Sequence, residues 1–173
     1  MHAMDDVLDG KRILIVDDEP DVLETLRELL DTCIVDSAPD FDTAKKFLKH
    51  QRYDAAILDI MGVKGYDILE LSKERGIPAI MLTAHALSPD HLVKSLKEGA
   101  QCYLPKDKMA DIQDYLAEVL QASEKGARNT RNWFERIKPY FDKNFGSDWE
   151  DNHSELLRDL NLIPTREEIE KIL

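Results

Sequence analysis

Short apolar runs alternate with amphipathic segments along the chain from about residue 11. Each run is rich in Ile, Val, Leu and Ala and is bounded by polar residues, Gly or Pro, a pattern typical of a buried strand. Between the runs, apolar side chains recur every three or four residues, as on the buried face of a helix. The predicted strands are residues 12–17, 33–37, 54–59, 79–83 and 101–104.

Residues that favour helix ends stand at the borders of the amphipathic segments. Pro20 suits the first turn of a helix, and Asp40 can cap the next one. Gly76 ends the third segment, Ser88 opens the fourth, and a long helix is expected from about Lys108. Strands and helices that alternate in this way predict an α/β fold. Its core is a doubly wound, five-stranded parallel sheet with helices on both faces.

The C-terminal part of the chain, residues 125–173, has a helical pattern but no strand. The last helix of the α/β part is expected to run on through Gly126, and Pro139 is expected to kink or restart it. Residues 146–152 are expected to form a loop and residues 154–160 a short helix. An apolar stripe at helical spacing is expected on the first helix of this part: Trp133, Phe134, Ile137, Tyr140 and Phe141.

The chain therefore divides into an N-terminal tail (1–10), an α/β domain (11–124) and a helical extension (125–173). Thr165 and Glu168 have the spacing of a capping box, which predicts a last short helix. An extension of this length is too short for an independent core. The aromatic stripe must pack on the α/β domain, on itself, or on a partner such as a second copy of the chain.

Composition narrows the class of protein further. The chain is 43% hydrophobic and 34% charged, as in ordinary globular proteins, and it contains no apolar run of about 18 residues that would span a membrane. Its start does not have the pattern of a signal peptide, so a cytoplasmic location is expected. The net charge is −12 and neither part is basic, so direct binding to nucleic acid is not expected. Cys33 and Cys102 are expected to be small buried hydrophobes.

Polar residues follow the predicted strands at their carboxyl ends. Asp17 and Asp18 follow the first strand, Asp59 ends the third, Thr83 ends the fourth and Lys106 follows the fifth. Ligands of such sheets bind beyond the carboxyl ends of the strands. Three carboxylates, a hydroxyl and an ammonium group are thus expected at one edge of the sheet.

This set of groups suits phosphoryl transfer. Crowded carboxylates repel one another unless a cation compensates, and Mg²⁺ prefers a few carboxylates together with phosphate oxygens. With the metal bound, Asp59 can act as a nucleophile toward phosphorus. Lys106 can neutralise a phosphate oxygen, and the Thr83 hydroxyl can donate a hydrogen bond to another. Each residue alone has an ordinary structural explanation, but their agreement at four strand ends favours a phosphoryl-accepting site.

Four motifs in this order resemble the receiver domains of bacterial two-component response regulators, the flavodoxin-like CheY family. They are ILIVDDEP (13–20), AAILDIM (55–61), IMLTA (80–84) and YLPK (103–106), and the likeness covers about residues 11–124. The resemblance implies that Asp59 accepts a phosphoryl group from a histidine kinase or a phosphotransfer protein.

The resemblance also implies a role for each of the other residues at the site. Asp18, Asp59 and the backbone carbonyl of Met61 would bind Mg²⁺ directly, and Asp17 would bind it through water. Thr83 and Tyr103 match the switch pair of the family. Met61 and His85 occupy positions that influence how fast water attacks the acyl phosphate. These implied roles complete the set of predicted site residues: Asp17, Asp18, Asp59, Met61, Thr83, His85, Tyr103 and Lys106.

Two features depart from the family pattern. The loop after Asp59 is about two residues shorter than usual and has no proline. In the family, proline follows the conserved lysine through a cis peptide, whereas here Pro105 precedes Lys106 and Asp107 follows it. A cis bond before Asp107 would cost about 3–4 kcal/mol. Either the loop bears that cost or Lys106 is presented differently.

Three functions remain open from the sequence. The first is a working receiver, an acceptor with self-catalysed transfer and slow autodephosphorylation rather than a classical enzyme. It would signal through a downstream protein partner or a homodimer formed by the extension, without a DNA-binding output domain. The second is a pseudo-receiver that serves as an interaction scaffold without being phosphorylated. The third is a Mg²⁺-dependent phosphohydrolase, which is disfavoured because Met61 stands where such enzymes have a second Asp.

Overall fold

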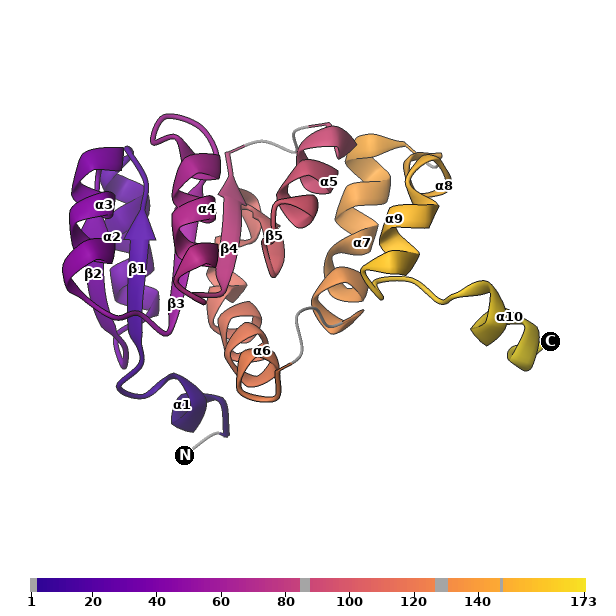
Figure 1. The fold of residues 1–173 in the computed structure, drawn as a ribbon, viewed down its shortest axis with the longest axis horizontal. Coiled ribbons are helices and arrows are strands. Elements are labelled where there is room, and N and C mark those ends of the chain that lie inside the picture. The colour runs from indigo at the N-terminus through magenta and orange to yellow at the C-terminus, as the bar shows by residue number, and fades with distance from the viewer. Residues whose placement is uncertain (1–2, 85–87, 127–130, 147) are drawn as a thin grey trace.

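The chain forms an α/β domain with a helical C-terminal extension on one side (Figure 1). The structure is a computed structural model, and it describes residues 3–84, 88–126, 131–146 and 148–173. Five parallel strands form one sheet in the order β2-β1-β3-β4-β5. The strands are β1 (Arg12–Val16), β2 (Ile34–Ala38), β3 (Ala55–Asp59), β4 (Ala79–Thr83) and β5 (Cys102–Pro105). The predicted parallel sheet is confirmed, with strand limits shifted by at most one residue.

Helices cover both faces of the sheet, as right-handed crossovers require. The chain moves from β1 to β2 in one direction and from β3 to β5 in the other, so the connecting helices fall on opposite faces. α2 and α6 pack together on one face, and α3 packs against α4 on the other. The helices of the domain are α2 (Pro20–Leu29), α3 (Phe41–His50), α4 (Gly65–Glu74), α5 (Pro89–Lys97) and α6 (Ile112–Glu124).

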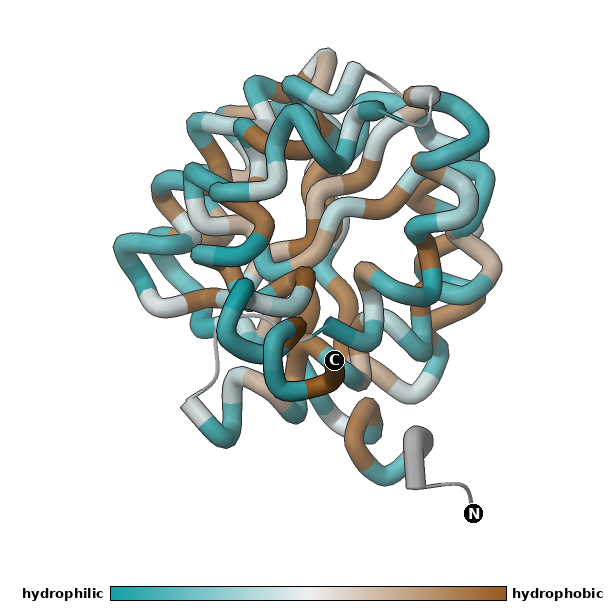
Figure 2. Tube along the Cα trace, turned by 90° about the vertical axis from the view of Figure 1, so that its right-hand side faces the viewer, coloured by the Kyte–Doolittle hydropathy of each residue, from teal (hydrophilic) through white to brown (hydrophobic). Residues whose placement is uncertain are grey.

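The sheet forms the centre of the hydrophobic core. β3 and β4 are buried along their whole length, because helices cover them on both sides. Apolar segments therefore gather in the middle of the molecule, with hydrophilic segments around them (Figure 2). The cysteines follow the expected pattern, since Cys102 is fully buried and Cys33 is partly buried, and both are free thiols.

The helix ends agree with most of the predicted signals. Pro20 begins α2, and the Asp40 side chain accepts a hydrogen bond of 2.7 Å from the backbone N–H of Thr43, as expected for a capping residue. The segment after β5 differs from the prediction. A 3₁₀ helix, η1 (Lys106–Asp111), comes first, and only then does α6 begin.

The predicted passage of the last helix through Gly126 is wrong. α6 ends at Glu124, and Gly126 has a positive φ of 73°, a conformation that stops a helix. A separate helix, α7 (Arg131–Phe145), follows and continues through Pro139 without restarting. Pro139 is exposed, so water can hydrogen-bond to the carbonyl group that its ring leaves free.

The rest of the extension is more helical than expected. The segment predicted as a loop contains α8 (Trp149–Asn152), whose Trp149 is buried. The predicted short helix is confirmed as α9 (Ser154–Asp159). Thr165 and Glu168 form the expected capping box at the start of α10 (Arg166–Ile172).

The extension packs on the edge of the sheet beside β5 (Figure 1). Trp133, Phe134, Ile137 and Phe141 of α7 are all buried. The Phe141 ring lies 5.9 Å from the ring of Tyr103 on β5, and the Trp133 backbone N–H donates to Glu118 of α6 over 2.9 Å. Of the three alternatives for the aromatic stripe, packing on the α/β domain is therefore the one observed. This packing also covers an edge strand that would otherwise be open to other chains.

The first ten residues are not only a tail. They contain a short helix, α1 (Ala3–Leu8), which packs against α6, and Leu8 is buried in the core. None of the helices in the described ranges is both long and apolar enough to cross a membrane.

Candidate functional site

The site lies where the strand order reverses. β1 and β3 are neighbours, and the chain leaves them toward opposite faces, so a crevice opens beyond their carboxyl ends. A pocket of about 280 Å³ occupies this place. Five predicted site residues line it: Asp18, Asp59, Met61, Thr83 and Lys106. Glu19, Gly62 and Ala84 complete the lining. The sheet therefore brings together residues that are far apart in the sequence.

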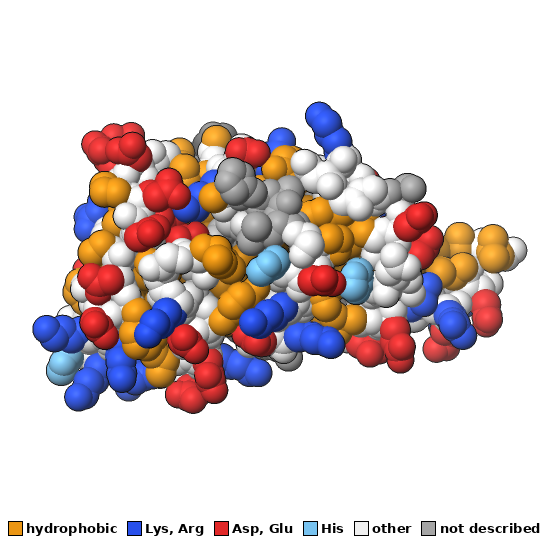
Figure 3. All heavy atoms as spheres, turned by 90° about the horizontal axis from the view of Figure 1, so that it is seen from above, with side chains coloured by type: hydrophobic (Ala, Val, Ile, Leu, Met, Phe, Trp, Pro, Cys, Tyr) orange, Lys and Arg blue, Asp and Glu red, His pale blue; other side chains and the backbone are white. Residues whose placement is uncertain are grey.

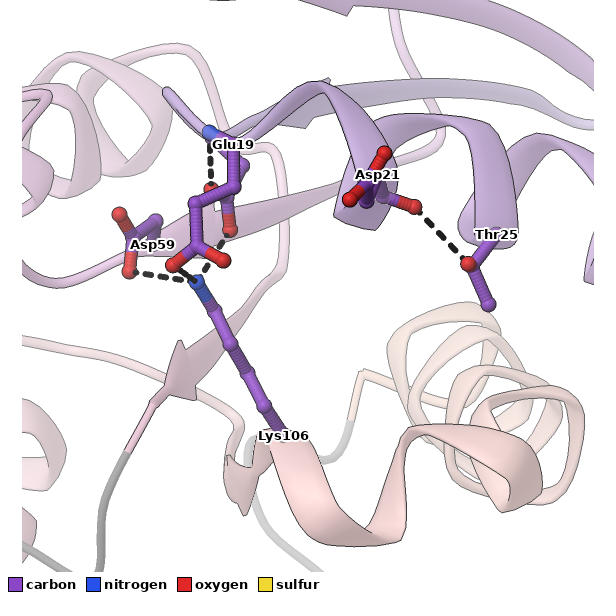
Figure 4. Close-up of polar contacts among 6 residues, drawn as sticks. Glu19, Asp21, Thr25, Asp59 and Lys106 are labelled. Atoms are coloured by element: carbon purple, nitrogen blue, oxygen red, sulfur yellow. Dashed lines mark hydrogen bonds and ion pairs between the residues drawn. The ribbon is translucent and has the colours of Figure 1, made fainter.

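Lys106 is the central contact of the site. Its Nζ lies 2.8 Å from Asp17 Oδ2, 3.1 Å from Glu19 Oε1 and 3.5 Å from Asp59 Oδ1. Figure 4 shows the ammonium group between the carboxylates of Glu19 and Asp59, at the end of a side chain that crosses from the start of η1. The Lys106 side chain is only 10% exposed, so water screens these contacts weakly.

Lys106 reaches the carboxylates without a cis peptide bond. None of the peptide bonds within the described ranges is cis, including the bond between Lys106 and Asp107. Lys106 is therefore presented in a different way from the lysine of the family pattern. Lys106 begins η1 directly after β5, with Pro105 extended at φ −68° and ψ 145°. The turn from strand to 3₁₀ helix thus directs the side chain into the site.

The carboxylates fit a divalent cation. One oxygen from each of Asp17, Asp18 and Glu19 lies within 4.8 Å of the others, and Asp59 faces them across Lys106. Asp17 Oδ2 is buried, and among the described residues its one partner is the ammonium group of Lys106, 2.8 Å away. A buried carboxylate oxygen of this kind is suited to a hard cation or to a water bound to one.

Burial and mutual repulsion change the acidity of two carboxyl groups. Burial raises the pKa of Asp59 to about 7, the charge of Asp17 adds to the rise, and the charge of Lys106 opposes it. Burial also raises the pKa of Asp17, against the opposing hydrogen bond from Lys106. Burial alone would lower the pKa of Lys106, but its hydrogen bond and ion pair with Asp17 raise it overall. The site is therefore short of positive charge.

This acidity predicts that Mg²⁺ affinity depends on pH. Asp59 is mostly protonated below its pKa of about 7, and the metal binds only the ionised carboxylate. Binding of Mg²⁺ at a lower pH must therefore displace this proton. We expect affinity to fall by about tenfold for each pH unit below that value and to level off above it. Isothermal titration with Mg²⁺ across this range measures the effect. Asp59→Asn is the control, which should flatten the dependence, and a flat profile for the wild type would contradict the prediction.

The short loop after Asp59 depends on two glycines. A Cβ at Gly65 would lie 2.1 Å from the backbone oxygen of Asp59, so no larger residue fits there. Gly62 has φ of 85°, and a Cβ there would lie 2.5 Å from Asp18 Oδ2. The short loop therefore packs directly against Asp18 and the backbone of Asp59. It places Met61 at the pocket with a side chain that is 63% exposed.

Thr83 and Tyr103 lie close together behind the pocket. Both are buried, and they share one side of the β4–β5 pair, where Thr83 stands opposite Pro105. Burial raises the pKa of the Tyr103 phenol, and its interaction with Thr83 opposes that rise. Among the described residues, however, none meets both the distance and the angle required for a hydrogen bond with the Tyr103 hydroxyl. Thr83 and Tyr103 are thus neighbours with a buried ring, and their role as a switch pair stays a prediction.

The sequence did not reveal every contact of the site. His85, predicted to modulate dephosphorylation, lies outside the described residues. Glu19 was not among the predicted site residues, yet it forms an ion pair with Lys106. Tyr140 was assigned to the aromatic stripe, yet its hydroxyl donates to Asp107 over 3.0 Å. No spacing rule connects positions so distant in the chain.

Comparison with known proteins gives one consistent result. The family described as "Response regulator receiver domain" matches residues 13–117. Among curated proteins, the two-component response regulator ARR10 of Arabidopsis thaliana is 30% identical over 132 residues, covering 72% of this chain and 24% of that protein. The DNA-binding response regulator MtrA of Mycolicibacterium smegmatis is 36% identical over 116 residues, covering 60% and 49%. The chain thus spans about half or less of the length of these relatives.

Solved structures match the same part of the chain. A CheY-like response regulator receiver domain protein from Methanospirillum hungatei has a TM-score of 0.62 at 29% identity, covering 68% of this chain and 99% of that one. The "putative response regulator" from Chloroflexus aurantiacus has a TM-score of 0.58 at 26% identity, covering 65% of this chain and 98% of that one. Both matches cover nearly all of the other chain, so the unmatched third here corresponds in size to the extension and tail.

Proposed function

Because the chain belongs to the response regulator receiver domain family, we propose that it accepts a phosphoryl group on Asp59 with the help of Mg²⁺. The donor would be a histidine kinase or a phosphotransfer protein. The observation that carries the proposal is the position of Lys106, whose ammonium group contacts Asp17, Glu19 and Asp59 together. A lysine held in this way at a strand end is placed to bind a phosphate oxygen when Asp59 is phosphorylated.

The residues of the chain divide the chemistry among them. An oxygen of the ionised Asp59 carboxylate attacks phosphorus, the bond from phosphorus to the donor breaks, and an acyl phosphate forms on Asp59. Lys106 then exchanges its contact with Asp59 for one with a phosphate oxygen, and the Thr83 hydroxyl donates to another. Asp18, Asp59 and the backbone carbonyl of Met61 would hold Mg²⁺ directly and Asp17 would hold it through water. The metal would neutralise charge on the transferring group.

Hydrolysis of the acyl phosphate belongs to the same proposal. The exposed Met61 side chain lies at the mouth of the pocket, where it can limit the access of water to phosphorus. His85 is proposed as the second modulator from its place in the sequence, two residues after Thr83. The acceptor would thus lose its phosphoryl group slowly without a separate enzyme.

The output is proposed to be a change in protein contacts. Thr83 and Tyr103 connect the site to β5, and β5 lies beneath the extension. Dimerisation through the aromatic stripe has little support, because four of its five members are buried within one chain. A homodimer or a downstream partner would instead find exposed apolar side chains at the projecting end of the extension (Figure 3): Ile172, which ends α10, and Leu173, which follows it.

Intact mass after incubation with acetyl phosphate tests the proposal. We expect a gain of one phosphoryl group per chain in the presence of Mg²⁺ and no gain in EDTA, because the carboxylates repel the donor when no cation is bound. Hydroxylamine should reverse the gain, since it cleaves acyl phosphates. If the wild type gains no mass with acetyl phosphate, phosphoramidate or a kinase, the pseudo-receiver scaffold becomes the better explanation.

A further inference from the structure

We propose that Tyr140 of the extension is a positioning residue for Lys106, so that the extension forms part of the phosphoryl-accepting site. The inference rests on the proposed function and adds to it a regulatory role for residues outside the α/β domain. It follows from the way in which η1 is held in place.

η1 has little packing of its own. It is a six-residue 3₁₀ helix, a conformation with poorer hydrogen bonds that seldom continues for so long. None of its residues is fully buried. Lys106, whose side chain is 10% exposed, and Met109, which is partly buried against the core, are its most enclosed members. A segment with so few buried side chains is expected to open easily. Contacts from outside η1 therefore decide how firmly Lys106, its first residue, is presented.

Tyr140 supplies such contacts at two adjacent positions. Its hydroxyl donates to Asp107 Oδ2 over 3.0 Å, and its ring lies under the Lys108 ammonium group, 5.8 Å from Nζ to the ring centroid. These two residues directly follow Lys106 in the chain. The pKa of Tyr140 is raised by burial and by the hydrogen bond to Asp107, in agreement with a phenol that donates to a carboxylate.

Tyr140 is itself held by a rigid part of the extension. Its ring makes an edge contact with Phe141, with centroids 6.4 Å apart, and Phe141 is fully buried against Tyr103 of β5. Glu118 fixes the other end of α7 by accepting from the Trp133 backbone N–H. The extension can therefore restrain η1 relative to the sheet rather than move with it.

Looser presentation of Lys106 has two opposite consequences. A phosphate oxygen on Asp59 would lose a well-placed cation, so phosphorylation would slow. The carboxylates of Asp17 and Asp59 would be less occupied by the ammonium group, so Mg²⁺ would bind more tightly to them. A general structural defect would weaken both processes, and this difference in sign separates positioning from mere stability.

Tyr140→Phe tests the inference because it keeps the ring and removes only the hydroxyl. We expect phosphorylation by acetyl phosphate to slow by about 3- to 10-fold, which corresponds to the loss of one ordinary hydrogen bond. We also expect Mg²⁺ affinity to rise. Hydrogen exchange in residues 106–111 of the metal-free protein should become faster by a similar factor. Arg131→Gln is the matched control on the same helix, since Arg131 hydrogen-bonds to Asn161 and Glu168, which both belong to the extension. It should change none of the three measurements.

The same substitution in a Lys106→Met background completes the test. If Tyr140 acts through Lys106, Tyr140→Phe should have no further effect on phosphorylation there. An equal loss in both backgrounds, unchanged exchange in η1, or a fall in Mg²⁺ affinity would each overturn the inference. If the wild type is never phosphorylated, the proposed function fails. Mg²⁺ affinity and hydrogen exchange then still decide whether Tyr140 positions Lys106.

Discussion

Replacing Asp59 with asparagine is expected to abolish phosphorylation while stabilising the metal-free protein. The neutral amide lacks the anionic carboxylate oxygen, so no acyl phosphate can form at this position. Intact mass with acetyl phosphate and Mg²⁺ should show no gain. If the variant is labelled as fully as the wild type, the acceptor is a different residue, and Asp18 in the same pocket would be examined next.

The stabilising effect follows from the acidity of Asp59. Its pKa rises from 3.8 to about 7 on folding, so the folded state holds the proton more tightly than the unfolded state. The contribution of Asp59 to stability is therefore greatest at a pH below its unfolded-state pKa. It falls as the pH rises through about 4 to 7 and stays low above that. At a pH of about 8, therefore, the ionised Asp59 weakens the metal-free fold.

Asparagine removes this penalty but also removes a partner of Lys106, 3.5 Å away. We therefore expect a net gain of about 1–3 kcal/mol in the free energy of unfolding at a pH of about 8. This is less than the whole rise in the pKa of Asp59 would give. Urea unfolding in EDTA measures it. Saturating Mg²⁺ should shrink the difference, because the wild type binds the metal better. Asp31→Asn, at an exposed carboxylate outside the site, should change stability by less than about 0.5 kcal/mol.

The sequence predicted the α/β domain well because its signals are local and repeated. Each strand is a short apolar run, and each helix begins or ends at residues such as Pro20 and Asp40 that act through their own backbone geometry or capping bonds. The parallel sheet then places Asp59 and Lys106 at one edge without further assumptions. The grouping of these two side chains could therefore be predicted from residue order alone.

The extension was harder to predict because its structure depends on contacts with the domain. α8 is a helix of four residues, too short to form alone, and it exists where Trp149 packs against Phe134 and Phe141. The pattern of the sequence continued across Gly126, whose positive φ ends α6. The contact between Tyr140 and Asp107 joins two polar groups with no periodic relation. Such contacts follow from the packed structure and not from local preference.

Phe141→Ala should be the most destabilising substitution in the extension. Phe141 is fully buried and lies within 6.4 Å, centroid to centroid, of the rings of Tyr103, Phe134, Tyr140, Phe145 and Trp149. Truncation leaves a cavity at the point where α7 meets β5, and we expect a loss of about 3–5 kcal/mol in the free energy of unfolding. Phe145→Ala is the matched control, four residues later on the same helix. Since Phe145 is only partly buried, its loss should be clearly smaller.

Two spectroscopic probes can show whether the extension and the domain unfold together. The only two tryptophans of the chain, Trp133 and Trp149, lie in the extension, so their fluorescence follows that part, whereas far-UV circular dichroism follows the whole chain. In the wild type the two transitions should coincide, because α7 and β5 share one core. In Phe141→Ala the fluorescence transition should come first, as the extension leaves an intact sheet. Coincident transitions in the variant would mean that the domain cannot stay folded without its extension, and separate transitions in the wild type would mean that the contact with Tyr103 is too weak to join them.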